Sequence, residues 1–503
     1  MTVENMPTFD LAKLENFNVL VNKSADVIES NEDSIREDYF SLDEKEANSF
    51  ATSIIYYGYA VLPPIYHSVF VDPLKNYFTS KYSEIRKYVE MDTTKKHTPF
   101  REWLDAINQR KNGHLKEASY AFEEVVNDLF DGWLIMSDRI NVRRPDFQTI
   151  SPLIRWGDDY KDGPYTIAAN RSIVENYNIR MSIVSMPASY TKNIALWGAT
   201  AHECAHDITH ADYGLLDEIS KLVMYNIKND EQLKSISVSY NGRKNRFVDR
   251  AAEYWKFVMP EAVADVLAIL NFGPSSAISL ATILIGSERN SSLRNINNAS
   301  DVHPIDALRL YLASDVIRSI PSLDFDIAKI WADVIEEIIQ DKIESKEEFI
   351  LIHPTPYSDY QTIGFPFNEM RKTVEIVANT IAFTPLKSLE DNSLSDINTW
   401  TLDDEIITND IANDFLDDRE PSLSNLGNYY GKVIYPTYLL SAAIIASAKS
   451  GNIEDITKCA ISVLEKSHAR NPVWRGFPIR FRSEMNIHSS LPSLHYSNKL
   501  EYP

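Results

Sequence analysis

Cysteine is scarce in this chain, which has two cysteines among 503 residues. Two cysteines provide no disulfide framework, and this scarcity fits a protein that folds in a reducing compartment. The first ten residues also lack the basic region followed by an apolar region that marks a secretory signal. We therefore expect a cytoplasmic protein.

Long apolar runs are missing as well. A membrane-spanning helix needs about 20 consecutive, mostly apolar residues. The two most apolar stretches are 262–286, which the turn-forming sequence 271–276 interrupts, and 433–448, which is short and carries polar residues. We expect both stretches to form buried core helices, and we expect no insertion into a membrane.

Basic residues are in deficit, since 50 lysines and arginines stand against 72 aspartates and glutamates, for a net charge of −22. A nucleic-acid-binding surface needs clustered lysine and arginine, so nucleic acid is not an expected partner. The same charge favours solubility and disfavours adhesion to anionic membranes. With 44% hydrophobic and 24% charged residues, the composition is otherwise that of an ordinary globular protein.

The most informative segment is a His-Glu-x-x-His pattern formed by His202, Glu203 and His206. On a helix, residues four apart lie on one face, so two imidazoles can bind one zinc ion with the glutamate beside the open coordination position. Such a pentapeptide arises by chance in roughly one or two chains per hundred of this length. The flanking sequence supports the pattern, because 191–200 has apolar residues at helical spacing and 179–186 alternates as a half-buried strand does.

A catalytic zinc site needs a third protein ligand and leaves one position for water. Glu261 is the best candidate, because Pro260 suits the first turn of a helix and an apolar helical run follows. Asp265 lies one turn later, where a carboxylate can accept the outer ring N–H of a ligand histidine. Two alternatives remain open. Asp212 completes a metzincin-like spacing that lacks the usual glycine, and Glu231 lies in a charged segment typical of a solvated loop.

Three short motifs follow one another in the middle of the chain. They are His202-Glu-x-x-His206, Glu261-x-x-x-Asp265 and His303-Pro-x-x-x-x-Arg309. In this order they resemble the motifs of the gluzincin zinc metallopeptidases, most closely those of the small-core branch, the minigluzincins, which includes the CAAX prenyl proteases. The resemblance covers about 130 residues. The prenyl proteases are embedded in membranes by several helices that we do not expect here, so their lipidated substrates are not carried over.

The resemblance implies roles for the motif residues. The implied ligands of Zn²⁺ are His202, His206 and Glu261. Glu203 is the implied general base, and His303 is the implied stabiliser of the charge that develops in the transition state.

Further residues are expected to support this chemistry. Asp265 would orient a ligand histidine, and Arg309 would pair with an acidic neighbour and so fix the helix that carries His303. His353 is also followed by proline and is the alternative to His303. A peptide substrate would lie extended against the strand around 181–185 and add a strand through main-chain hydrogen bonds.

We expect an α+β fold that is predominantly α-helical. It would comprise a helical N-terminal region (1–149), a zincin-like metallopeptidase core with a small mixed sheet (150–320) and a helical C-terminal region (321–503), in which 327–343 has the pattern of an amphipathic helix. The predicted function is hydrolysis of a peptide or protein substrate by a zinc-activated water. The alternative is a non-catalytic zincin-fold scaffold or binding protein with a structural or decayed zinc site. The sequence leaves the oligomeric state open.

Overall fold

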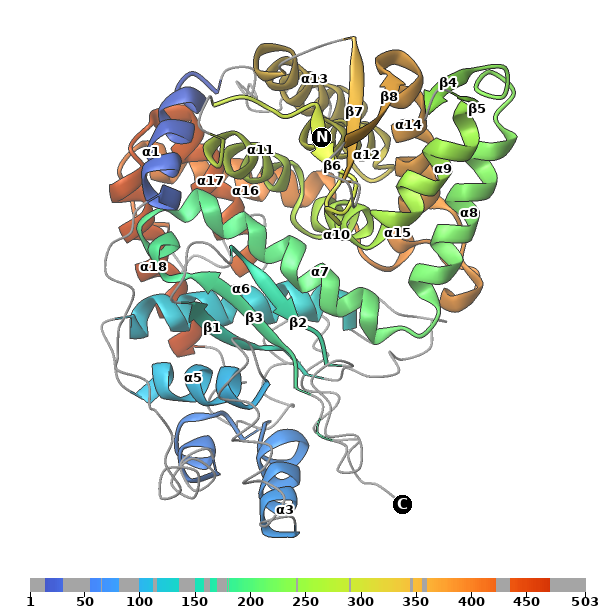
Figure 1. Cartoon of the computed structure of the whole chain (residues 1–503). Helices are drawn as coiled ribbons and strands as arrows, with labels where there is room; N and C mark the ends of the chain where they lie inside the picture. The colour runs from blue at the N-terminus through green and yellow to red at the C-terminus, as the bar shows by residue number, and fades with distance from the viewer. Residues whose placement is uncertain are drawn as a thin grey trace.

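The fold is mostly helical, as the sequence predicts (Figure 1). The computed structural model describes residues 14–29, 55–64, 66–80, 99–111, 115–134, 150–157, 163–169, 179, 181–240, 243–288, 291–343, 347–354, 360–421 and 435–470. Among these residues the strands form three small sheets, so the chain belongs to the α+β class.

The helices run along the whole described chain. The α-helices are α1 (Phe17–Glu29), α3 (Asp72–Ser80), α5 (Pro99–Lys111), α6 (Lys116–Leu134), α7 (Ala199–Ala211), α8 (Leu215–Asn229), α9 (Phe247–Phe257), α10 (Met259–Phe272), α11 (Pro274–Gly286), α12 (Asp306–Ser319), α13 (Phe325–Lys342), α14 (Phe367–Phe383), α15 (Leu394–Ile397), α16 (Leu402–Leu416), α17 (Pro436–Ser450) and α18 (Ile453–Arg470). Shorter helical turns are the π-helix η2 (His67–Val71) and the 3₁₀ helices η4 (Ala188–Lys192), η5 (Ile194–Gly198) and η6 (Lys387–Leu389).

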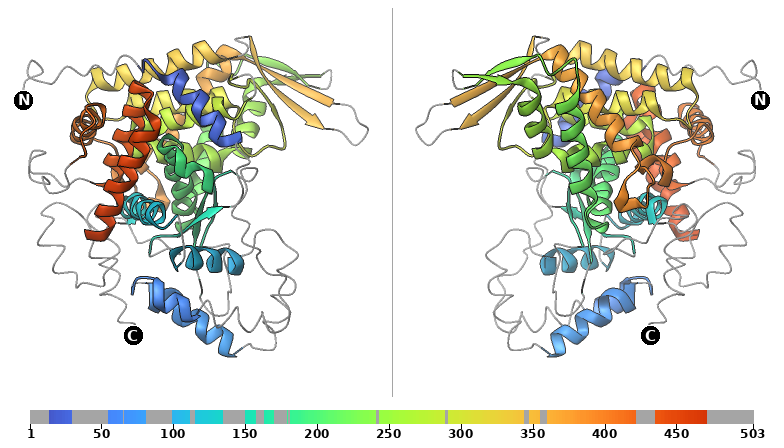
Figure 2. Two further views of the ribbon diagram at one scale, coloured as in Figure 1. Left: turned by 90° about the vertical axis from the view of Figure 1, so that its left-hand side faces the viewer. Right: turned by 90° about the vertical axis from the view of Figure 1, so that its right-hand side faces the viewer.

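The strands are short except in one hairpin. They are β1 (Leu153–Gly157), β2 (Tyr165–Ile167), β3 (Ile183–Pro187), β4 (Ser237–Tyr240), β5 (Arg243–Arg246), β6 (Ile296–Asn298), β7 (Glu348–Pro354) and β8 (Tyr360–Pro366). The β7–β8 hairpin extends away from the helices, with the β4–β5 hairpin beside it (Figure 2).

The first sheet has the order β1-β3-β2, with β3 parallel to β1 and antiparallel to β2. Strand β3 confirms the strand expected before the histidine motif, and all five of its residues are buried. Both of its edges are paired, since Ser185 lies opposite Arg155 on one side and Tyr165 on the other. The prediction that a substrate adds to 181–185 is therefore wrong, because a central strand has no free main-chain groups to offer. Among the described residues this sheet has two edge strands, β1 and β2, and β2 is the one that packs against α7.

Helices cover both faces of this sheet (Figure 1). Helices α6 and α7 pack on the face that carries Trp156 and Val184, whereas α5 packs on the opposite face, which carries Leu153 and Ile183. On the α6 side, the buried ring of Trp156 lies 4.7 Å from Phe122 and 5.3 Å from Trp197, measured between ring centroids. These aromatic contacts fix β1 and the segment before α7 on the same core.

The apolar stretch 262–286 forms two buried helices, α10 and α11, as the sequence predicts. They are separated at Gly273, whose φ of 70° is in the left-handed region that favours glycine. A Cβ atom at this position would overlap the ring of Trp400, so the close packing also requires glycine. In the part of the chain that the structure describes, no helix is both long and apolar enough to cross a membrane.

The ends of the described chain pack onto its middle. Helix α18 packs against α6, α1 packs against α11, and α17 packs against both α16 and η5. Helix α13 confirms the amphipathic helix expected at 327–343 and packs against α12. One cluster of buried apolar side chains therefore extends from α1 to α18. The division into three regions at 149 and 320 stays a prediction.

Candidate metal centre

The helix that carries both motif histidines is α7, and it begins at Ala199. The helical spacing expected from residue 191 is instead resolved into the two 3₁₀ turns η4 and η5. Asn193 separates them in an extended conformation, and its side chain accepts a hydrogen bond from the Ala195 N–H at the start of η5. Because Asn193 caps the start of η5, the helical turn of η4 ends before it. The spacing of the apolar residues does not predict this break.

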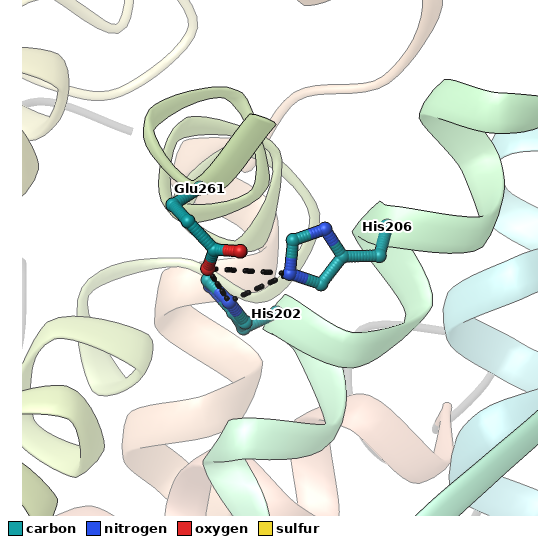
Figure 3. A group of neighbouring side chains, drawn as sticks. All are labelled: His202, His206 and Glu261. Atoms are coloured by element: carbon teal, nitrogen blue, oxygen red, sulfur yellow. Dashed lines mark hydrogen bonds and ion pairs between the residues drawn. The ribbon is translucent and has the colours of Figure 1, made fainter. Parts of the chain in front are cut away.

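Two helices bring three ligand-type side chains together (Figure 3). His202 and His206 lie four residues apart on α7, and Glu261 lies in the first turn of α10, which packs against α7. The Nε2 atoms of the two histidines are 3.1 Å apart. Glu261 Oε2 is 3.1 Å from Nε2 of His202 and 3.4 Å from Nε2 of His206. These three residues could hold a metal ion.

The spacing of the three atoms fits tetrahedral coordination. Zinc binds nitrogen and oxygen ligands at about 2.0–2.1 Å, so the ligand atoms of a tetrahedral site lie about 3.3 Å from one another. The three measured separations, 3.1, 3.1 and 3.4 Å, are close to this value.

The charges at the site also favour a cation. Burial alone lowers the pKa of His202, but the carboxylates of Asp265 and Glu261 outweigh burial and raise that pKa to about 10. Burial alone raises the pKa of Glu261, and hydrogen bonding and charge from the two histidines shift it far below its ordinary value. The carboxylates and the histidine nitrogens of the site therefore favour a positive charge at the point where they meet. A proton or a metal ion can supply this charge.

A buried pair of opposite charges supports the first histidine. Asp265 Oδ1 lies 2.8 Å from Nδ1 of His202, which leaves Nε2 as the ring nitrogen that faces the site. Arg309, on α12, donates two hydrogen bonds of 2.8 Å to the same carboxylate. Burial raises the pKa of Asp265, but the Arg309 guanidinium outweighs burial and lowers it to about 2. The acidic neighbour expected for Arg309 is therefore Asp265, and the carboxylate stays ionised.

Glu203 lies one residue after His202 and points toward the edge strand β2. Its carboxylate oxygen Oε2 accepts a hydrogen bond of 2.9 Å from the hydroxyl of Thr166, which also lies 2.8 Å from the Glu203 carbonyl oxygen. The Glu203 side chain is buried, with 6% of the residue exposed. Thr166 was not anticipated from the sequence, because it lies 37 residues from Glu203 in a segment without a motif.

His303 reaches the site from the loop before α12. Its Nε2 atom is 3.5 Å from Glu261 Oε2, and its Nδ1 atom is 2.9 Å from Oδ1 of Asp301. Asp301 also accepts the His303 backbone N–H, and Asn297 donates to the His303 carbonyl oxygen at 3.2 Å. The imidazole is 48% exposed, which is more than the side chains of His202, His206 and Glu261. Asp301 and Asn297 hold the histidine at three atoms and were not expected from the sequence.

The other candidates lie elsewhere. Asp212 is buried at the C-terminal cap of α7, and Glu231 is 84% exposed and forms an ion pair with Lys234 at 2.6 Å. Of the three carboxylates considered as third ligand, Glu261 is the one that the structure places among the histidine nitrogens. His353 lies on β7 opposite Gln361, and its side chain is outside the described part of the chain.

No family of known proteins, no curated protein and no solved structure gives a match to this chain. Two imidazoles and a carboxylate at tetrahedral spacing are ligands that a metal ion such as zinc accepts in proteins.

Proposed function

We propose that the protein is a zinc-dependent peptidase of the gluzincin type. The observation that carries this proposal is the convergence of His202, His206 and Glu261 at separations of 3.1–3.4 Å, with Glu203 on the same helix as the histidines. Two imidazoles and one carboxylate leave a fourth tetrahedral position for water, as catalytic zinc sites do. A purely structural zinc site is usually closed by four protein ligands and has no use for a glutamate beside the metal.

Each side chain has a distinct task in this proposal. Zinc bound here supplies a Lewis acid that lowers the pKa of water towards about 7 and polarises the substrate carbonyl. Glu203 takes the proton of the attacking water and passes it to the leaving amine. His303, held through Nδ1 by Asp301, directs its Nε2–H at the carbonyl oxygen as negative charge develops there.

The substrate would lie along β2. In the described part of the chain, β2 pairs with β3 on one side and with no strand on the other. An extended peptide can pair with such an edge through main-chain hydrogen bonds. The contact of Thr166 with Glu203 supports this choice of edge, since Glu203 is the proposed general base. This geometry supports recognition of the peptide backbone and implies no particular side-chain preference.

Digestion of a mixed library of unstructured peptides, read by mass spectrometry, tests the proposal. The native protein should generate new peptide termini, chelation of its metal should abolish them, and one equivalent of Zn²⁺ should restore them. A zinc-loaded protein that leaves every peptide intact would favour the non-catalytic alternative, a zincin-fold scaffold with a structural zinc.

A further inference from the structure

Strand β2 and the residues just after it are joined to helix α7 by hydrogen bonds at two positions. The first is the hydroxyl of Thr166, which lies 2.9 Å from Oε2 of Glu203 and 2.8 Å from its carbonyl oxygen. The second is the backbone N–H of Ala169, which donates to Oδ1 of the buried Asp207 at 3.1 Å. Ala169 is three residues after Thr166, and Asp207 is one helical turn after Glu203. Thr166 of the strand and Ala169 just after it therefore contact two successive turns of α7.

The direction of Thr166 follows from the pleat of the strand. Successive side chains of a strand point to opposite faces of the sheet. Its neighbour Tyr165 points to the α5 side, where its hydroxyl contacts Arg155 at 2.8 Å and Glu102 at 2.8 Å. Thr166 consequently points to the α7 side, toward Glu203. The contacts of Tyr165 anchor the strand on its other face, so the backbone that carries the threonine hydroxyl is held from both faces of the sheet.

The chemistry of the contact favours the carboxylate as acceptor. A hydroxyl has one proton to donate, and an ionised carboxylate is a stronger acceptor than a backbone carbonyl. Threonine is stiff at χ1 because it is β-branched, whereas glutamate has three rotatable side-chain bonds. The threonine therefore restricts the glutamate, and restriction of a reacting group to its productive geometry is worth a large factor in rate.

We propose that Thr166 is a positioning residue for the general base, and that it couples the base to the strand that receives the substrate. This inference rests on the proposed peptidase function. Because Thr166 sits on β2 itself, a peptide that pairs with this strand and the carboxylate that activates water are held by one residue. The strand that binds the peptide and the carboxylate of Glu203 are thus aligned with each other before the substrate binds.

Kinetics of hydroxyl-free variants test the positioning role, with a fluorogenic peptide chosen from those that the native protein cleaves. Thr166→Val should lower kcat by about 10- to 100-fold, keep its zinc and leave KM within about twofold, because the hydroxyl acts on the base and not on substrate affinity. Thr166→Ser should restore most of the activity, and Thr166→Ala should show the same loss as Thr166→Val. The matched control is Thr209→Val, since the Thr209 hydroxyl donates to the His206 carbonyl oxygen at 2.9 Å and should be dispensable for kcat.

A measurement without turnover tests the contact itself. In chelator-treated protein, the shifts in unfolding midpoint caused by Thr166→Val and Glu203→Ala should be non-additive in the double variant. Additive shifts overturn the inference, and so does a Thr166→Val enzyme that turns over like the native one or a Thr166→Ser enzyme as slow as Thr166→Val. If the native protein itself cleaves no peptide, the proposed function fails and the positioning role fails with it; native cleavage with undiminished Thr166→Val overturns the present inference alone.

Discussion

At the scale of single residues, the hydrogen bonds and ion pairs of buried charged side chains determine the geometry of the site. Asp265 illustrates this, because it accepts hydrogen bonds from His202 on one side and from Arg309 on the other. The sequence could indicate Asp265 and Arg309 through their motifs, but it could not indicate that they pair with each other. The sequence also could not predict that Thr166 contacts Glu203 or that Asp301 contacts His303. Both contacts depend on how a strand and a loop are placed in the fold.

The identity of the third ligand gives the first prediction. Glu261→Ala should reduce the zinc content from about one per chain to near zero, because two histidines alone leave the site without its carboxylate. Asp212→Ala and Glu231→Ala should retain zinc, and Glu231→Ala is the cleaner control because the side chain is exposed. Elemental analysis of dialysed protein gives the answer. Loss of metal in Asp212→Ala with retention in Glu261→Ala would contradict the gluzincin-type assignment.

The support of His202 gives the second prediction. Asp265→Asn keeps the size of the side chain but removes the charge that orients the imidazole, so zinc affinity should fall by about 10- to 100-fold in a chelator competition. Asp315→Asn is a matched control, because Asp315 also forms a largely buried pair with an arginine, Arg371, on α14. Both variants should lose stability, and the control should bind zinc as tightly as the native protein. Equal zinc affinity in Asp265→Asn would show that the carboxylate does not support the ligand.

At the scale of elements, local patterns predicted most of the helices and strands near the site. Alternation indicated β3, the turn sequence indicated the break at Gly273 between α10 and α11, and amphipathic spacing indicated α13. Pairing between strands was the feature that local patterns missed. The alternation of apolar and polar residues does not distinguish a central strand from an edge strand. The sequence therefore pointed to β3 for substrate pairing, although β3 is the central strand between β1 and β2.

Close packing between η5 and α11 gives a prediction at this scale. A Cβ atom at Gly198 would overlap the side chain of Ser279, whose hydroxyl donates to the Ala195 carbonyl oxygen at 2.6 Å. Gly198→Ala should therefore lower the free energy of unfolding by about 1–3 kcal/mol, through overpacking at the start of α7. Gly286→Ala, where an added Cβ atom would meet its nearest neighbour at 3.5 Å, should be close to neutral. Chemical denaturation of the two variants measures this difference. Equal free energies of unfolding would mean that Gly198 and Ser279 are not tightly packed.

At the scale of the whole molecule, the candidate metal centre combines elements that are distant in the sequence. The two histidines come from α7, Glu261 and Asp265 from α10, and Arg309 from α12, while α17 and α11 pack against the segment before α7. The motifs predicted which residues meet, because their order and spacing carry that information. The helices from the two ends of the described chain, α1, α17 and α18, carry no motif, so their packing onto α6, α11 and η5 could not be predicted from the sequence.

The most direct test of the central proposal is a paired measurement on Glu203→Gln. Glutamine keeps the shape of the side chain and can still accept the hydrogen bond from Thr166, but it cannot act as a base. The variant should retain about one zinc per chain and lose roughly 10²- to 10⁴-fold in kcat for peptide hydrolysis. Full zinc content together with native turnover would contradict the account, because hydrolysis would then proceed without the residue assigned as its general base.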